Sequence, residues 1–182
     1  METTRSSARR PAAVLFDRDG TLVIDVPYNG DPDAVTPMPG AVEAVARVRA
    51  AGLPTAVVSN QSGIARGLLT ADQVAAVNAR VDAVLGPFDA WCVCPHGPAD
   101  DCDCRKPRPG LVLEAARRLG VDPADVVVIG DIGADVGAAA AAGARGILVP
   151  TPVTRDTEVA AAAEVAADLR AAVDAALTGD TA

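Results

Sequence analysis

The stretch Ala12-Ala-Val-Leu-Phe-Asp-Arg-Asp-Gly-Thr21 places two carboxylates, Asp17 and Asp19, directly after an uninterrupted apolar run. The run over 13–16 predicts a buried strand, and Gly20 predicts a turn where that strand ends. Most Asp-Gly pairs are solvated turns, so this motif does not decide a function by itself. Two carboxylates at this spacing do suit phosphoryl transfer, because one can attack phosphorus while the other passes a proton to the leaving oxygen.

Short apolar runs alternate with helical patterns along the whole chain. The runs predict strands over 13–16, 55–59, 90–94, 126–130 and 146–149. Helix start and stop signals predict helices from Gly40 to Gly52, Thr70 to Gly86, Pro109 to Gly120, 135–142 and 158–177. The strands are rich in valine and do not alternate strictly, as is typical of parallel strands covered on both faces. We therefore predict an α/β fold with a central parallel sheet between two layers of helices.

The length of the chain predicts one domain of moderate size. The chain has 182 residues and a formal net charge of −8. We expect a disordered lead over 1–10 and a single domain over 11–178. The acidic balance argues against a nucleic-acid surface. No apolar run approaches ~20 residues and no export signal is visible, so we expect a cytoplasmic protein without a membrane partner. We also expect a monomer.

The carboxyl ends of three predicted strands carry polar side chains. Asp17 and Asp131 come directly after the first and fourth strands, and Ser59 is the last residue of the second. Because parallel sheets bind ligands at the carboxyl ends of their strands, we expect the three side chains to lie at one functional edge.

All four cysteines fall in a short segment that also holds the only histidine. Cys94 and His96 form one pair at i and i+2, and Cys102 and Cys104 form another. In an extended segment the side chains at i and i+2 lie on the same side of the backbone, so the two residues of each pair can bind the same metal ion. Together the two pairs can supply the four ligands of a structural zinc site. A disulfide is disfavoured by strain and by a reducing compartment. We expect Cys92 to be a small buried residue; the competing interpretation of His96 is a catalytic histidine.

Four segments together resemble the haloacid dehalogenase (HAD) phosphatase superfamily. They are Asp17-Arg-Asp-Gly-Thr21, Ser59-Asn-Gln-Ser-Gly-Ile-Ala-Arg-Gly67, Arg105-Lys-Pro107 and Gly130-Asp131, in matching order across residues 12–150. The resemblance implies a Rossmann-like three-layer fold. It also implies a magnesium-dependent phosphatase that acts through an aspartyl-phosphate.

The resemblance assigns a role to each matching residue. Asp17 would be the nucleophile, and Asp19 would protonate the leaving group and then deprotonate water. The Asp17 carboxylate, the Asp19 backbone carbonyl and Asp131 would hold Mg²⁺. Ser59 and Lys106 would stabilise the transferring phosphoryl group.

The cysteine segment narrows the resemblance to one branch of the superfamily. Cys94-Pro-His96 with Cys102-Asp-Cys-Arg-Lys-Pro107 is similar to heptose 1,7-bisphosphate phosphatases and to the phosphatase domain of histidinol-phosphate phosphatases. The implied substrate is a phosphosugar, with histidinol phosphate as the alternative. The implied substrate contacts are Asp25, Tyr28, Asn60, Gln61, Ser62 and Arg105. The sequence departs from this branch at two points. Ile132 follows the predicted metal aspartate where the heptose enzymes often have a polar residue, and the interval between His96 and Cys102 is short for the branch.

Two residues have alternative roles on the sequence alone. Asp135 is either a partner of the metal site or only a residue of a helix N-terminus. Arg66 either assists substrate binding or faces solvent. The chain has no room for a large cap domain, so we expect an open site shaped by loops 22–38, 61–69 and 95–108. A catalytically inactive zinc module and a nucleic-acid 3′-phosphatase are weaker alternatives, because the carboxylate set is intact and the net charge is acidic.

Overall fold

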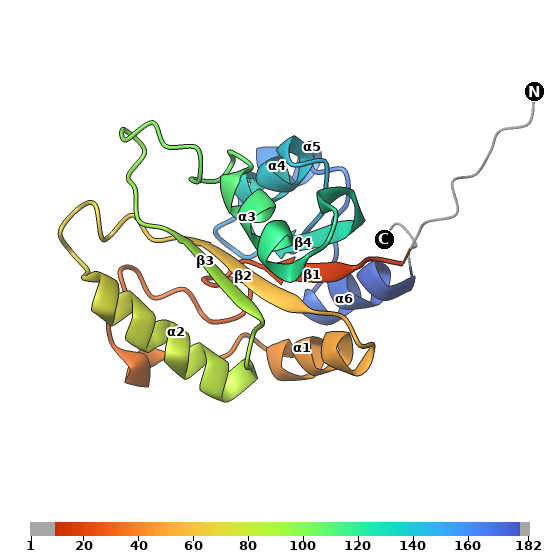
Figure 1. The fold of residues 1–182 in the computed structure, drawn as a ribbon, viewed down its shortest axis with the longest axis horizontal. Coiled ribbons are helices and arrows are strands. Elements are labelled where there is room, and N and C mark those ends of the chain that lie inside the picture. The colour runs from red at the N-terminus through yellow and green to blue at the C-terminus, as the bar shows by residue number, and fades with distance from the viewer. Residues whose placement is uncertain (1–9, 179–182) are drawn as a thin grey trace, which may run out of the picture.

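Five parallel strands form one central sheet in the computed structural model, which describes residues 10–178. The strands are β1 (Ala13–Phe16), β2 (Thr55–Asn60), β3 (Ala90–Cys94), β4 (Val126–Gly130) and β5 (Arg145–Leu148). Their order in the sheet is β3-β2-β1-β4-β5 (Figure 1). All five predicted strands are confirmed, with bounds that differ by one residue in β2 and β5. The predicted lead over 1–10 lies outside the described residues except for Arg10.

Helices cover both faces of the sheet and make the predicted three layers (Figure 1). One face carries α1 (Ala41–Ala50), α2 (Ala71–Leu85) and α6 (Leu169–Thr178). The opposite face carries α3 (Gly110–Leu119) and α4 (Gly133–Ala141). The strands are buried on both sides because alternate residues enter different cores: Val14 and Phe16 pack with α1, whereas Ala13 and Leu15 pack with α3. None of the described helices is long and apolar enough to span a membrane.

A capping box starts α2 at Thr70, the residue at which the sequence predicted this helix to begin. The Thr70 hydroxyl accepts a hydrogen bond from the backbone N–H of Gln73 (3.1 Å), and the Gln73 side chain accepts one from the N–H of Thr70 (2.9 Å). Both otherwise unpaired donors at the helix start are therefore satisfied.

The single helix predicted over 158–177 is wrong. The structure has a short helix α5 (Asp156–Ala161), then an extended segment, then α6. In the extended segment Glu164 accepts a hydrogen bond from the N–H of Leu148 (2.9 Å), and Ala166 donates one to the carbonyl of Leu148 (2.8 Å). The segment thus pairs with the end of the edge strand β5. These backbone bonds outweigh the helix propensity of an alanine-rich sequence, which is a weak local preference.

The chain between β1 and α1 forms no cap domain. Residues 17–40 contain only a 3₁₀ turn (Pro32–Ala34) and two isolated β-bridges, Asp19 with Val23 and Val23 with Pro37. The carboxyl ends of β1, β2 and β4 therefore open towards solvent between loops, as the sequence predicted.

Two leucines of α3 give a matched test of the core. Leu111 is fully buried, whereas Leu113 of the same helix is 42% exposed. We expect Leu111→Ala to lower the free energy of unfolding by about 2–5 kcal/mol through lost burial and a cavity. Leu113→Ala should change it by no more than about 0.5 kcal/mol. Urea denaturation of both variants measures the difference, and equal losses would contradict this account of the α3 layer.

Candidate active site

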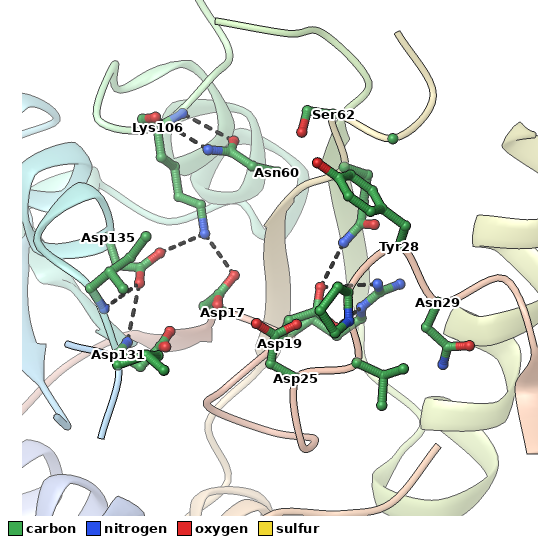
Figure 2. Close-up of a pocket in the computed structure, with 17 residues that line it drawn as sticks. Asp17, Asp19, Asp25, Tyr28, Asn29, Asn60, Ser62, Lys106, Asp131 and Asp135 are labelled. Carbon is green, nitrogen blue, oxygen red and sulfur yellow. Dashed lines mark hydrogen bonds and ion pairs between the residues drawn. The ribbon is translucent and has the colours of Figure 1, made fainter. Parts of the chain in front are cut away.

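A cavity of about 350 Å³ opens at the carboxyl edge of the sheet, where the sequence predicted the site. Asp17 and Asp19 after β1, Lys106 and Asp131 all line it, so the structure brings together residues from three segments that are far apart in the chain (Figure 2). The loops 22–38 and 61–69 supply the outer wall.

Lys106 lies at the centre of this cluster and is almost completely buried. Its ammonium donates hydrogen bonds to Asp17 Oδ1 (2.7 Å), to Asp135 Oδ1 (2.6 Å) and to the carbonyl of Val58 (2.8 Å). Burial alone favours a neutral amine, but the carboxylates of Asp135 and Asp17 raise the pKa of Lys106 above its usual value. The side chain is therefore a fixed positive charge beside the predicted nucleophile.

Three carboxylates crowd together around that ammonium. Oxygen atoms of Asp17, Asp131 and Asp135 all lie within 4.8 Å of one another. Burial raises the pKa of Asp17 well above its usual value, and the negative charges of Asp135 and Asp131 add to the effect against the opposing charge of Lys106. Burial and the charge of Asp135 raise the pKa of Asp131 to about 7. A buried set of hard oxygen donors that repel one another fits a divalent cation such as Mg²⁺.

Gly20 permits the close approach of the two catalytic loops. Its φ of +84° is the left-handed conformation that favours glycine, and a Cβ at this position would clash with the Asp131 carboxylate. The glycine of the Asp-Arg-Asp-Gly-Thr motif thus brings β1 and β4 together at the predicted metal site.

Asp135 serves two parts of the site at once. Its Oδ2 accepts hydrogen bonds from the backbone N–H groups of Asp131 and Ile132 (both 3.1 Å), and its Oδ1 accepts from Lys106. Of the two alternatives for Asp135, the structure supports both: it stabilises the start of α4 and it also belongs to the carboxylate cluster. Gly130 leaves room for it, because a Cβ there would clash with the Asp135 side chain.

Asp19 is held by two side chains whose role the sequence did not reveal. Arg18 donates to both of its carboxylate oxygens (3.0 Å each), and Gln61 Nε2 donates to Oδ2 (2.8 Å). Gln61 was predicted only as a substrate contact, and Arg18 was not singled out. The position of Arg18 between two aspartates could have indicated an ion pair with one of them. A basic residue in a loop after a strand usually faces solvent, so its burial could not be expected from the sequence.

Ser59 lies deeper than its predicted role suggests. It is 1% exposed and is not among the residues that line the cavity. Its hydroxyl accepts a hydrogen bond from Gln61 Nε2 (2.8 Å), the same nitrogen that donates to Asp19. The structure thus places Ser59 behind Gln61.

Five of the six predicted substrate contacts line the same cavity as Asp17; they are Asp25, Tyr28, Asn60, Gln61 and Ser62. Burial and the charge of Asp19 raise the pKa of Asp25. Asn60 also fixes the backbone of Lys106: its Nδ2 donates to the Lys106 carbonyl (3.2 Å) and its Oδ1 accepts from the Lys106 N–H (3.1 Å).

The sixth predicted contact, Arg105, lies apart from the others. It lines a neighbouring cavity of about 260 Å³ that shares only Lys106 with the first, and it donates to the carbonyl of His96 (3.2 Å). Arg66 is exposed and lies over the ring of Tyr28, with its guanidinium carbon 5.8 Å from the ring centroid. Tyr28, Ile132 and Val153 are exposed apolar or aromatic residues at the rim of the main cavity.

The four predicted zinc ligands converge beside this second cavity. The sulfur atoms of Cys94, Cys102 and Cys104 lie 3.1–3.7 Å apart, and His96 Nδ1 lies 3.3 Å from Cys104 Sγ and 3.6 Å from Cys94 Sγ. All four cysteines are free thiols. A tetrahedral site with Zn–S bonds of about 2.3 Å places sulfur atoms about 3.8 Å apart, so the donor set fits zinc.

Cys92 is not part of that cluster. It is buried in β3, and burial raises its pKa to about 11, so it stays a neutral thiol at pH 7. The structure therefore agrees with its predicted place as a small core residue.

The raised pKa of Asp131 gives a testable dependence of stability on pH. Without metal, the native state keeps a proton on Asp131 up to about pH 7, whereas the unfolded chain loses it near the ordinary value of 3.8. This carboxylate therefore destabilises the native state progressively as pH rises from about 4 to 7. We expect Asp131→Asn to flatten this part of the dependence in urea denaturation with EDTA. Asp33→Asn, at an exposed position, is the control, and equal slopes for Asp131→Asn and the unchanged protein would contradict the assignment.

Comparison with known proteins agrees with this geometry. Residues 14–91 match the family described as haloacid dehalogenase-like hydrolase, and residues 103–172 match the HAD-hydrolase-like family. The chain is 40% identical over 149 residues to the D-glycero-β-D-manno-heptose-1,7-bisphosphate 7-phosphatase of Bordetella bronchiseptica, covering 79% of this chain and 83% of that protein. It is 38% identical over 143 residues to the enzyme of the same name from Pseudomonas aeruginosa, covering 76% and 80%.

A solved structure shows the same fold. The crystal structure of the B. bronchiseptica D,D-heptose 1,7-bisphosphate phosphatase, complexed with magnesium and phosphate, superposes with a TM-score of 0.78 at 34% identity. The match covers 89% of this chain and 96% of that one. The resemblance found in the sequence is therefore confirmed: the chain belongs to the haloacid dehalogenase-like hydrolases, in the family of the heptose-1,7-bisphosphate phosphatases.

Proposed function

We propose that this chain is a Mg²⁺-dependent phosphatase that hydrolyses D-glycero-D-manno-heptose 1,7-bisphosphate through an aspartyl-phosphate. The observation that carries the proposal is the position of Lys106, whose buried ammonium lies 2.7 Å from Asp17 in a cluster of metal-binding carboxylates. The relatives to which the chain is 38–40% identical are named as phosphatases of this bisphosphate.

In the first step an Asp17 carboxylate oxygen attacks phosphorus and forms an acyl phosphate. The bond between phosphorus and the ester oxygen breaks, its electron pair stays on that oxygen, and Asp19 donates the proton that completes the free hydroxyl. Asp19 suits this role because it lines the cavity with a side chain that is 26% exposed, two residues from the nucleophile.

In the second step water attacks the phosphorus of the acyl phosphate. Asp19, now a carboxylate, takes a proton from that water, the bond from phosphorus to the Asp17 oxygen breaks, and inorganic phosphate leaves. Lys106 stabilises charge on the phosphoryl oxygens through both steps. Ser59 accepts a hydrogen bond from the Gln61 amide that also donates to Asp19, so it helps to hold the acid–base carboxylate in place.

Asp17, Asp131 and the backbone carbonyl of Asp19 would hold Mg²⁺, which supplies positive charge that lets a carboxylate approach a phosphate. The related B. bronchiseptica enzyme was crystallised with magnesium and phosphate. Burial, together with repulsion from neighbouring carboxylates, raises the pKa values of Asp17 and Asp131, and this cost of an uncompensated buried charge is the physical support from the chain itself.

The loops around the cavity would bind the sugar. Asp25, Tyr28 and Ser62 offer hydrogen-bonding groups at its wall. Arg105 is the proposed contact for the second phosphate, because its planar fork can hold a phosphate bidentately and it borders the next cavity.

Zinc is proposed as a structural ion held by Cys94, His96, Cys102 and Cys104. The last ligand directly precedes Arg105 and Lys106, and the carbonyl of His96 accepts a hydrogen bond from Arg105. A closed four-ligand site would thus fix the loop that presents both cations.

The substrate assignment is tested by comparing kcat/KM for four phosphate esters. These are heptose 1,7-bisphosphate, its two monophosphates and histidinol phosphate. We expect the bisphosphate to be preferred and Arg105→Ala to narrow its advantage by about 1–3 kcal/mol, the scale of a charge-assisted hydrogen bond. Faster hydrolysis of histidinol phosphate would replace the proposed substrate.

The mechanism is tested by loss of turnover. Asp17→Asn and treatment with EDTA should each abolish turnover, and added Mg²⁺ should restore it only in the EDTA-treated protein. Full activity of Asp17→Asn would contradict the mechanism.

The zinc site is tested by metal analysis of protein purified without chelator. We expect one zinc per chain, retained in Cys92→Ser and lost in Cys102→Ser, with increased proteolysis of the 95–108 loop in the second variant. Cys92→Ser is the matched control because Cys92 lies two residues before Cys94 yet outside the cluster. Zinc added in place of Mg²⁺ should not support turnover. Loss of zinc on Cys92→Ser, or none in the unchanged protein, contradicts the assignment.

A further inference from the structure

We infer that Arg18 is a positioning residue that orients the Asp19 carboxylate for proton transfer, and that Asn78 of α2 fixes Arg18 in turn. The inference rests on the acid–base role proposed for Asp19. Arg18 Nε donates to Asp19 Oδ1 and Arg18 Nη2 donates to Asp19 Oδ2, both at 3.0 Å. This two-point contact sets the rotation of the carboxylate, which a single hydrogen bond would not do.

Arg18 is itself held rigidly. Its side chain is 1% exposed, and its remaining terminal nitrogen, Nη1, donates to Asn78 Oδ1 at 2.8 Å. Asn78 lies in the middle of α2, a helix that is anchored by the buried side chains of Val77 and Val81. The order of contacts is therefore α2, Asn78, Arg18 and Asp19, from the packed core to the cavity.

Arg18 does not have the contacts expected of a substrate-binding arginine. It borders the cavity, but all three guanidinium nitrogens are engaged with Asp19 or Asn78 and almost none of its surface is accessible. Asp19, with 26% of its side chain exposed, is the member of the pair that can reach substrate. Without Arg18, Gln61 would be the remaining side-chain donor to Asp19 among the contacts of the described chain.

The orientation of Asp19 matters because proton transfer requires hydrogen-bond reach, about 2.6–3.2 Å between heavy atoms. A misplacement of about 1 Å can cost about 10²-fold in rate. An alkyl phosphate such as a sugar phosphate needs that proton, since an alkoxide is a poor leaving group. A nitrophenyl phosphate does not, since nitrophenolate leaves readily without it. The ratio of the two kcat/KM values therefore reports proton donation in the first step alone.

The experiment measures this ratio, sugar bisphosphate over p-nitrophenyl phosphate, in the Mg²⁺-loaded enzyme. We expect Arg18→Lys, which keeps the charge but loses the planar fork, to lower the ratio at least about tenfold with little change in KM. Asn78→Ala should lower it less, by about threefold or more, and it guards against misfolding of the Arg18 variant. Arg80→Ala, an exposed position on the same helix, should leave it unchanged.

The same variants are then made in an Asp19→Asn background. If Arg18 acts through Asp19, Arg18→Lys has no further effect on the ratio there, because no proton donor remains. An unchanged ratio in both Arg18→Lys and Asn78→Ala, or the same further loss with Asp19→Asn already present, overturns the inference. If Asp19→Asn itself leaves the ratio unchanged, it is the proposed acid–base mechanism that fails, and the two failures are thus distinguished.

Discussion

The contact on which the rest of the site depends is the buried ammonium of Lys106 between Asp17 and Asp135. Its two partners follow different strands, β1 and β4, and its third hydrogen bond goes to a backbone carbonyl of β2. A buried ion pair loses solvation on both sides, and removal of one partner leaves an uncompensated charge. The cluster therefore favours the arrangement in which all three strand ends and the Lys106 loop are in place together.

The position of Lys106 gives a physical reason for a cluster of three cysteines and a histidine to lie beside the catalytic carboxylates. Lys106 belongs to no helix or strand, and a long flexible side chain on a mobile loop would reach Asp17 only part of the time. Two constraints fix its backbone: the paired hydrogen bonds to the Asn60 side chain, and the Cys94–Cys104 cluster that ends two residues before it. A domain without a cap has few other ways to order a loop at an open edge.

The sequence predicted the features that depend on local patterns. The five buried strands follow from apolar runs, and the meeting of Asp17 and Asp131 follows from their positions just after two parallel strands, while Lys106 was assigned to the site through the family resemblance. It failed where tertiary contacts decide: the segment around Val165 pairs with β5 instead of continuing a helix. Arg18 was missed because burial of a charge cannot be read from a charged tripeptide, and the separation of Arg105 from the main cavity depends on loop geometry.

An open edge also determines where substrate selectivity can come from. Two arginines that border the cavities differ in freedom: Arg18 is fully engaged and buried, whereas Arg105 donates a hydrogen bond to a backbone carbonyl and borders the second cavity. In the proposed function a substrate with one phosphate would engage Lys106 alone, whereas one with two phosphates would also engage Arg105 in the neighbouring cavity. Arg105 and Lys106 directly follow Cys104, so a zinc ion bound to the Cys94–Cys104 cluster would set the distance between the two cations. Selection by that distance does not require a cap that closes over the substrate.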